Sequence, residues 1–192
     1  MMDFKRPIVL ATASEARRKL VADTGLNFLS DSVDIDESPL PGEAIGEYVS
    51  RLALAKAAAA LPPSLDAVIV TVDTAIGLGD EIIGKPADEA DARRILGKLS
   101  GKTHEVASAI AVRDASGASC SVETVRTEVA FDQLSEMAVE WYISTGEWKN
   151  RAGAYAIQGK GASLISEVRG CFTNVIGISI PTLLRMLSSI RS

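Results

Sequence analysis

Residues 66–86 read DAVIVTVDTAIGLGDEIIGKP, and this stretch decides the fold class. The apolar, β-branched run at 66–74 predicts a strand of a central sheet, and the glycines at 77–80 predict a hairpin-like turn into 81–84. Asp73 ends the apolar run. Open α/β sheets bind ligands beyond the carboxyl ends of their strands, where a carboxylate can hold Mg²⁺ or act as a general base. The alternative is a turn-forming aspartate.

Outward from this strand, strand and helix patterns alternate along the chain. Further strands are predicted at 7–12, 104–113, 121–131, 162–168 and 173–179. Helices are predicted from Ser14 to Gly25, at 42–60, from Asp88 to Leu99, at 135–145 and from Pro181 onward. This order predicts an α/β fold with a mixed sheet, as one elongated domain of two lobes over 1–192.

Composition excludes several classes of protein. The net charge of −5 gives no global electrostatic case for nucleic-acid binding, and no apolar run is long enough to span a membrane. His104 is the only histidine, which excludes a multi-histidine zinc site. Cys120 and Cys171 are far apart and form no CxxC motif, which favours reduced thiols in the cytoplasm. No Walker A loop and no GxGxxG motif are present.

Lys56 breaks the pattern of the helix at 42–60. Ile45, Val49 and Leu52 define one apolar stripe of that helix, and Lys56 falls on the stripe. A lysine in this place either snorkels to a rim or points into a cleft and meets an anion.

Arg17 lies where the first strand turns into a helix, three residues after the predicted N-cap Ser14. Free N–H groups and the helix dipole favour an anion at such a helix start. Arg17 shares a side of the helix with Leu20 and Val21 and is predicted to point inward. A solvated pair with Arg18 is the alternative.

Four further polar residues are weaker candidates. Lys85 stands between a glycine and a proline, in a stiff turn that can present its ammonium at a fixed place. Glu37 follows Asp36 in a polar loop, either solvated or as a second carboxylate beside a metal. Gln158 is an amide among small and apolar residues that either reads a base edge or caps a loop. For His104 we expect a structural hydrogen bond.

These residues stand in blocks that keep a fixed order along the chain. The blocks are LATASEARRKL (10–20), DES (36–38), RLALAKA (51–57), VDTAIGLGDEIIGKP (72–86), LSGKTHEV (99–106), TEVAF (127–131), RAGAYAIQGKGASLI (151–165) and NVIGI (174–178). Together they closely resemble the Maf family of nucleoside triphosphate pyrophosphatases, also called septum formation inhibitors. The resemblance covers nearly the whole chain.

The resemblance implies a two-lobed α/β fold around a cleft and hydrolysis of a nucleoside triphosphate to the monophosphate and pyrophosphate. It implies a divalent cation, with Asp73 as the proton acceptor and Glu37 as the matching acidic residue of the early loop. We expect that Asp73, helped by Glu37, holds this Mg²⁺ or Mn²⁺ or activates the water. The resemblance implies that Arg17, Lys56 and Lys85 bind the phosphates, near Ser14. A homodimer is a further expectation from the family.

Base choice in the family is linked to three positions, which are occupied here by Ala16, Thr74 and Gln158. Thr74 and Gln158 match the branch that acts on dTTP and UTP, whereas Ala16 matches neither that branch nor the one acting on 7-methyl-GTP. We therefore expect a preference for dTTP and UTP, with a broader range of substrates than in the strict pyrimidine branch. Thr71, bulkier than the family's usual residue, is expected to narrow the pocket.

Alternative functions are a 7-methyl-GTP pyrophosphatase, a nucleotide-binding regulator of cell division without turnover, and a phosphomonoesterase that releases orthophosphate.

Overall fold

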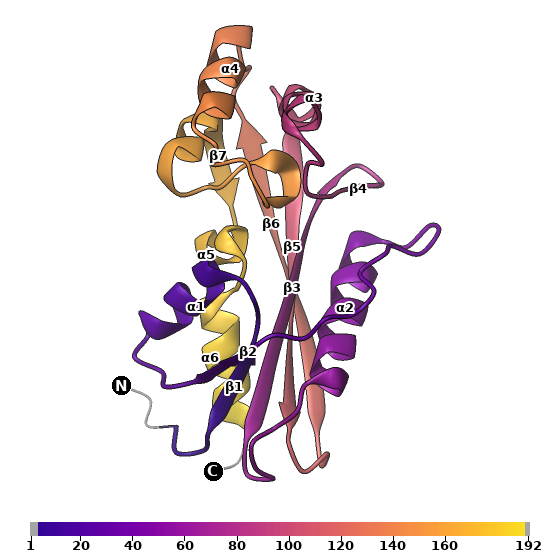
Figure 1. The fold of residues 1–192 in the computed structure, drawn as a ribbon, viewed down its shortest axis with the longest axis vertical. Helices are drawn as coiled ribbons and strands as arrows, with labels where there is room; N and C mark the ends of the chain where they lie inside the picture. The colour runs from indigo at the N-terminus through magenta and orange to yellow at the C-terminus, as the bar shows by residue number, and fades with distance from the viewer. Residues whose placement is uncertain (1–3, 191–192) are drawn as a thin grey trace. The chain divides into compact units, whose positions relative to one another are not determined.

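A seven-stranded sheet is the frame of the computed structural model, which describes residues 4–190 (Figure 1). Its strands lie in the order β2-β1-β3-β5-β6-β7, and β4 pairs with β3. Strand β1 is parallel to β2 and to β3, whereas the pairs β3–β4 and β6–β7 are antiparallel. The predicted α/β fold, a mixed sheet flanked by helices, is confirmed.

The strands are β1 (Ile8–Ala11), β2 (Leu29–Asp31), β3 (Val68–Leu78), β4 (Glu81–Ile83), β5 (Thr103–Asp114), β6 (Cys120–Phe131) and β7 (Ile165–Arg169). The α-helices are α1 (Glu15–Ala22), α2 (Ile45–Ala59), α3 (Glu89–Leu99), α4 (Glu136–Ser144), α5 (Phe172–Ile176) and α6 (Ile180–Ser189). Two 3₁₀ helices, η1 (Ala152–Ala154) and η2 (Gly159–Leu164), precede β7.

The chain divides into two compact units. Unit 1 contains the described residues up to Thr74, the segment Ser108–Val125 and the described residues from Gly177 onward. Unit 2 contains Ala75–Ala107 and Arg126–Ile176. The expectation of a single domain over 1–192 stays a prediction.

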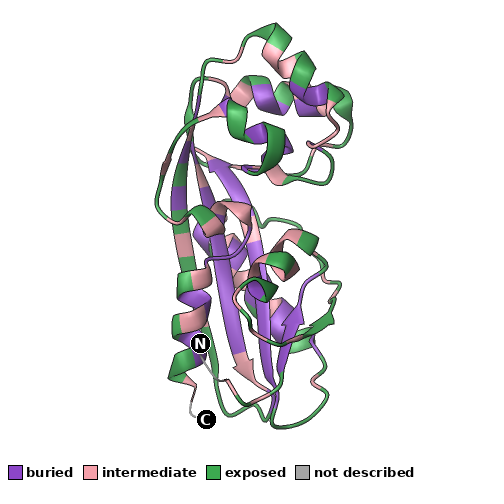
Figure 2. Ribbon diagram, turned by 90° about the vertical axis from the view of Figure 1, so that its left-hand side faces the viewer, coloured by how far each residue is buried: buried purple, intermediate pink, exposed green. Residues whose placement is uncertain are grey.

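In unit 1, the alternation of β3 sends successive side chains to opposite faces of the sheet. Val68, Val70 and Val72 pack with residues of α1 and α6 in one apolar cluster. The side chains between them face the side on which α2 lies (Figure 1). Buried residues accordingly concentrate along the strands (Figure 2). Asp73 therefore emerges on the α2 side, because it lies two residues after Thr71 and side chains two residues apart share a face of the sheet.

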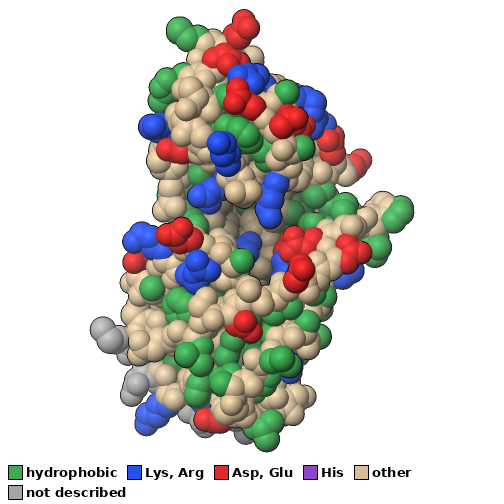
Figure 3. Space-filling view, in the orientation of Figure 1, with side chains coloured by type: hydrophobic (Ala, Val, Ile, Leu, Met, Phe, Trp, Pro, Cys, Tyr) green, Lys and Arg blue, Asp and Glu red, His purple; other side chains and the backbone are tan. Residues whose placement is uncertain are grey.

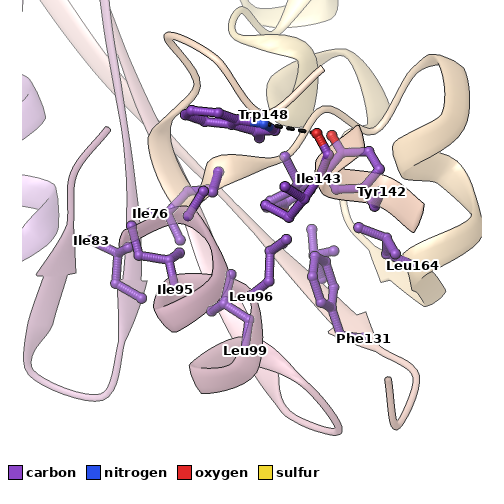
Figure 4. Packing of buried hydrophobic residues seen from close by; sticks show 14 of the residues in the cluster. Ile76, Ile83, Ile95, Leu96, Leu99, Phe131, Tyr142, Ile143, Trp148 and Leu164 are labelled. Carbon is purple, nitrogen blue, oxygen red and sulfur yellow. Dashed lines mark hydrogen bonds between the residues drawn. The ribbon is translucent and has the colours of Figure 1, made fainter. Parts of the chain in front are cut away.

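Unit 2 has its own apolar core, built by α3, α4 and the segment that follows α4 (Figure 4). Leu96 and Leu99 of α3 are fully buried in it. Trp148 covers this core, and its indole Nε1 donates to the carbonyl of Ile143 at 3.0 Å. The buried indole thus keeps a hydrogen-bond partner.

The structure corrects three local predictions and adds one strand. The segment 173–179 is not a strand, because α5 occupies Phe172–Ile176, and β7 begins only at Ile165 after the 3₁₀ helix η2. A short apolar run has no period that separates strand from helix, which explains both errors. The predicted turn at 77–80 is shorter, since β3 continues to Leu78. The short edge strand β2 was not predicted.

Acidic and basic side chains are interspersed over the face of the molecule seen in Figure 3. Cys120 and Cys171 are free thiols. The absence of a nucleic-acid partner stays a prediction.

Within residues 4–190, no helix is both long enough and apolar enough to cross a bilayer.

His104 has the structural role that the sequence predicted. Its Nε2 lies 2.7 Å from the hydroxyl of Tyr155, and its ring packs edge-on against Phe131 and Tyr155. Among the described residues its Nδ1 has no hydrogen-bond partner. Burial lowers the pKa of His104 from 6.5 to about 4, so the imidazole is neutral in the fold at pH 7.

We expect His104 to make the protein acid-sensitive. The unfolded chain binds this proton near pH 6.5 and the folded chain only near pH 4, so stability is full above pH 6.5 and is lost as the pH falls toward 4. The loss amounts to about 3 kcal/mol. In His104→Gln, urea unfolding from pH 7 to pH 4 should lack this component. An identical pH slope in both proteins would refute the assignment.

Candidate active site

Helix α2 is fixed on the sheet by hydrogen bonds to its carbonyl groups. The hydroxyl of Thr71 on β3 donates to the carbonyl of Ala53 at 2.6 Å. Arg113 on β5 donates to Ala57 and Ala60 at 2.7 and 2.8 Å, which satisfies carbonyls at the helix end that lack an intrahelical partner. Thr71 is therefore committed to the interface under α2, where its bulk is accommodated.

The docked helix brings Lys56 between two carboxylates. Its Nζ lies 2.7 Å from Oδ1 of Asp73 and 2.5 Å from Oε1 of Glu37. Lys56 is only 8% exposed, and Asp73 only 6%. The snorkelling interpretation of Lys56 is therefore wrong. The Glu37 loop is exposed, as the solvated-loop interpretation has it, but the Glu37 carboxylate also pairs with Lys56.

Burial raises the pKa of Asp73, because the charged form loses solvation; Lys56 and Arg17 oppose this effect. A carboxylate with a raised pKa is a better proton acceptor near neutral pH than an exposed one. Lys56 and Arg17 stabilise the ionised form of Asp73 and so limit the rise of its pKa.

Arg17 points inward, as predicted, and is not part of a solvated pair. Ser14 caps α1, since its hydroxyl accepts from the backbone N–H of Arg17 at 3.4 Å. Nε of Arg17 donates to the carbonyl of Gly177 at 2.8 Å, and Nη1 donates to the hydroxyl of Thr12 at 3.4 Å. Burial lowers the pKa of Arg17, while Asp73 and Glu37 raise it. The guanidinium thus has a fixed place in the field of both carboxylates.

Thr74 shares the Gly177 carbonyl with Arg17. Its hydroxyl donates to that carbonyl at 3.0 Å and lies 2.8 Å from the hydroxyl of Ser108. A hydroxyl has one proton, so Ser108 is the donor in that second bond, and Thr74 can only accept from a further group.

Gly177 is required at this junction of Arg17 and Thr74. Its φ of +135° disfavours other residues, and a Cβ would lie 3.2 Å from Nε of Arg17. The close approach of this carbonyl to the guanidinium therefore depends on glycine.

Two predicted site residues, Lys85 and Gln158, belong to unit 2, whereas the other six belong to unit 1. Both side chains are exposed. Their loops are joined, because the N–H of Gly153 donates to the carbonyl of Gly84 at 3.0 Å. Gln158 precedes η2 and makes no side-chain cap there, which removes the capping interpretation.

The residues of unit 1 fit a divalent cation as a partial ligand set. Within residues 4–190, no three His, Cys, Asp or Glu side chains are grouped closely enough to enclose a metal alone. Asp73 and Glu37 nevertheless converge on one cationic atom, the Nζ of Lys56. Mg²⁺ is commonly held by one or two carboxylates together with substrate phosphates and water. The donor set is of this kind.

Residues of a second layer around the site were not found from the sequence. Arg17 is oriented by Thr12 and Gly177, and Thr74 by Ser108 and Gly177. None of these three residues interrupts a hydrophobic pattern in the sequence. Thr12, Gly177 and Arg51 carried one signal each, since they lie in the blocks at 10–20, 174–178 and 51–57.

A family comparison identifies the chain. The profile described as Maf-like protein matches residues 7–190. The chain belongs to the Maf-like protein family. A protein of Anaeromyxobacter dehalogenans strain 2CP-1 named dTTP/UTP pyrophosphatase is 46% identical over 175 residues, which cover 90% of this chain and 88% of that protein. A protein of Myxococcus xanthus with the same name is 42% identical over 173 residues, covering 90% and 87%.

A solved structure supports the fold of this Maf-like chain. The structure of a HAM1 protein from Coxiella burnetii covers 96% of this chain and all of its own, with a TM-score of 0.53. At 13% identity this likeness concerns the fold alone.

Proposed function

We propose that this Maf-like protein is a nucleoside triphosphate pyrophosphatase that acts preferentially on dTTP and UTP. The observation that carries the proposal is the buried cluster in which Lys56 pairs with Asp73 and Glu37 beside the anchored Arg17. Cations beside carboxylates suit a triphosphate with a divalent metal. The relatives named dTTP/UTP pyrophosphatase support the same reaction.

In this proposal Asp73 accepts a proton from the attacking water. The water oxygen forms a bond to the α-phosphorus, the bond from that phosphorus to the α–β bridging oxygen breaks, and pyrophosphate leaves with the bond electrons. The raised pKa of Asp73 suits this task. Lys56, Arg17 and Lys85 stabilise charge that develops on the phosphate oxygens. Ser14, whose hydroxyl caps α1, helps to bind the phosphates at the start of that helix.

Asp73 and Glu37 would hold the cation, Mg²⁺ or Mn²⁺. When bound, it would offset phosphate charge and polarise the phosphoryl oxygens.

Base choice is assigned to Thr74 and Gln158. Because the proton of Thr74 is used by Gly177, its hydroxyl offers only an acceptor to a base. Thymine and uracil carry an N3–H that can donate to such an acceptor, whereas cytosine has a bare N3. A hydrogen-bonding site rejects a base that leaves its polar groups unpaired. Ala16 offers a base neither a charge nor an aromatic ring. Because this contact is missing, we expect the enzyme to accept a broader range of bases.

A panel of dTTP, UTP, dCTP, CTP, GTP and 7-methyl-GTP with Mg²⁺ or Mn²⁺ tests the proposal. Pyrophosphate and orthophosphate are measured separately. We expect equimolar pyrophosphate and monophosphate, with kcat/KM for dTTP and UTP about 10-fold or more above that for dCTP and CTP. Orthophosphate as the first product would indicate a phosphomonoesterase, and binding without turnover a regulator. A sharp preference for 7-methyl-GTP would overturn the assignment of base choice.

The homodimer and the cytoplasmic location stay predictions. Size-exclusion chromatography with light scattering tests the first.

A further inference from the structure

The segment that carries Glu37 has little apolar contact to hold it. Residues 32–40 form neither helix nor strand, and 36–40 are exposed. The side chain of Glu37 itself is 49% exposed. An exposed irregular segment samples many conformations unless polar contacts restrain it.

Glu43 and Arg51 form the first restraint. Nε and Nη2 of Arg51 donate to Oε1 and Oε2 of Glu43 at 2.6 and 2.7 Å, a bidentate pair that also fixes orientation. Oε2 of Glu43 accepts in addition from the backbone N–H of Leu40 at 3.0 Å. The hydrogen bonds from Arg51 lower the pKa of Glu43 to about 2, so this carboxylate is ionised throughout the neutral range.

Two further bonds end on main-chain carbonyls of this segment, one at Glu37 and one at Ser38. The hydroxyl of Tyr48 donates to the carbonyl of Glu37 at 2.8 Å. Nη2 of Arg51 donates to the carbonyl of Ser38 at 3.1 Å. The guanidinium also lies over the ring of Tyr48, 5.7 Å from its centroid, which couples the two donors. Both come from α2, the same helix that carries Lys56.

We propose that Glu43, Tyr48 and Arg51 form a clasp that holds the backbone of Glu37 against α2 and thereby positions its carboxylate beside Lys56 and Asp73. The proposal rests on the proposed function for its effect on catalysis. The clasp residues are positioning residues, because they act on the site through the main chain of Glu37 and Ser38.

The arrangement on α2 gives the clasp a physical reason. Tyr48, Arg51 and Lys56 share one rigid helix, which Arg113 and Thr71 dock to the sheet. A hydrogen bond from this helix to the main chain of Glu37 therefore fixes the Glu37 carboxylate relative to the docked helix. Partners in such an outer layer typically affect metal affinity or activity by about 10- to 100-fold when they are removed.

Arg51→Gln tests the clasp. We expect the Mn²⁺ concentration at half-maximal activity to rise about 10- to 100-fold, and Mn²⁺ binding without nucleotide, measured by electron paramagnetic resonance, to weaken in parallel. The amide proton of Leu40 should exchange faster, because its acceptor Glu43 is released. Arg51→Lys keeps the positive charge but cannot form the bidentate pair with Glu43. Its Mn²⁺ dependence and Leu40 exchange should therefore lie between those of the wild-type protein and Arg51→Gln.

Arg185→Gln is the matched control. Arg185 forms a bidentate pair with Glu123 at 2.9 and 2.7 Å in the same unit. Its loss removes a pair of the same bidentate kind, although a more exposed one, without touching the Glu37 segment. We expect wild-type Mn²⁺ dependence and wild-type protection of Leu40 in this variant.

A double-variant cycle separates positioning from general stabilisation. If the clasp acts through Glu37, Arg51→Gln should add nothing to the activity loss of Glu37→Gln. Independent, additive losses would overturn the proposal, as would unchanged Mn²⁺ dependence and Leu40 exchange in Arg51→Gln. If Arg51→Gln fails to fold, Tyr48→Phe removes the one hydroxyl that binds the carbonyl of Glu37, and it serves for the Mn²⁺ measurements.

Failure of the clasp is distinguishable from failure of the proposed function. A wild-type protein without pyrophosphate release would refute the function, while Leu40 exchange and nucleotide-free Mn²⁺ binding still test the clasp.

Discussion

Asp73→Asn is expected to lower kcat for dTTP hydrolysis by at least about 10²–10³-fold while the protein stays folded. Asparagine preserves the size of the side chain and an oxygen that can accept from Lys56, but it removes the proton acceptor. The raised pKa of Asp73 means that its charged form is less favourable in the folded than in the unfolded chain. Loss of this charge should therefore not reduce the free energy of unfolding. Pyrophosphate release and urea unfolding measure the two effects.

Asp114→Asn is the control for this substitution. Asp114 is paired with Arg6 at 2.9 Å in unit 1, and hydrogen bonds from Ser116 and Arg6 lower its pKa to about 2. Its ionised form is favoured in the folded chain, so the same chemical change should reduce stability and leave kcat intact. Wild-type activity in Asp73→Asn would remove Asp73 from the proposed mechanism.

Lys56→Met should lower kcat/KM by a comparable factor, about 10²–10³-fold, and should also shift the pH profile. Lys56 lowers the pKa of Asp73 against the effect of burial. Its removal raises that pKa further, so the ionised carboxylate forms only at higher pH. We expect the ascending limb of kcat/KM against pH to move upward, with partial recovery of activity in alkaline buffer.

The same variant leaves a buried carboxylate with one cationic neighbour fewer. Breaking a buried pair costs up to about 3–5 kcal/mol, and Arg17 and protonation of Asp73 reduce this loss. Lys98→Met is the control, because Lys98 pairs with Glu81 on the surface of unit 2. A pH limb that stays in place in Lys56→Met, with activity retained, would mean that Lys56 does not tune Asp73.

Much of the fold could be predicted from local chemistry. Ser14 and Asp88 cap their helices with side-chain oxygens, as predicted, and the long apolar run at 66–74 is a buried strand. These signals depend on neighbouring residues along the chain, so they are readable without tertiary contacts. The segment 173–179 failed because its apolar residues suit a strand and a short helix equally well.

The chemistry of the site was predictable as a set of residue types, and its geometry was not. A lysine on an apolar helix stripe and an aspartate at the end of an apolar strand each break a local pattern. That Lys56 pairs with Asp73, 17 positions away, follows from the docking of α2 on β3. The hydroxyls and carbonyls that orient Arg17 break no local pattern at all.

By itself the sequence determined the element types, the family and the inventory of charged groups, because hydrophobic periodicity, caps and motif blocks are local properties of the chain. Only the tertiary structure decided which of these groups meet. Gly177 reaches Arg17 across 160 positions, and the clasp on Glu37 forms because α2 faces a segment that precedes it. Such contacts depend on how buried faces pack against one another, and packing is a property of the whole chain.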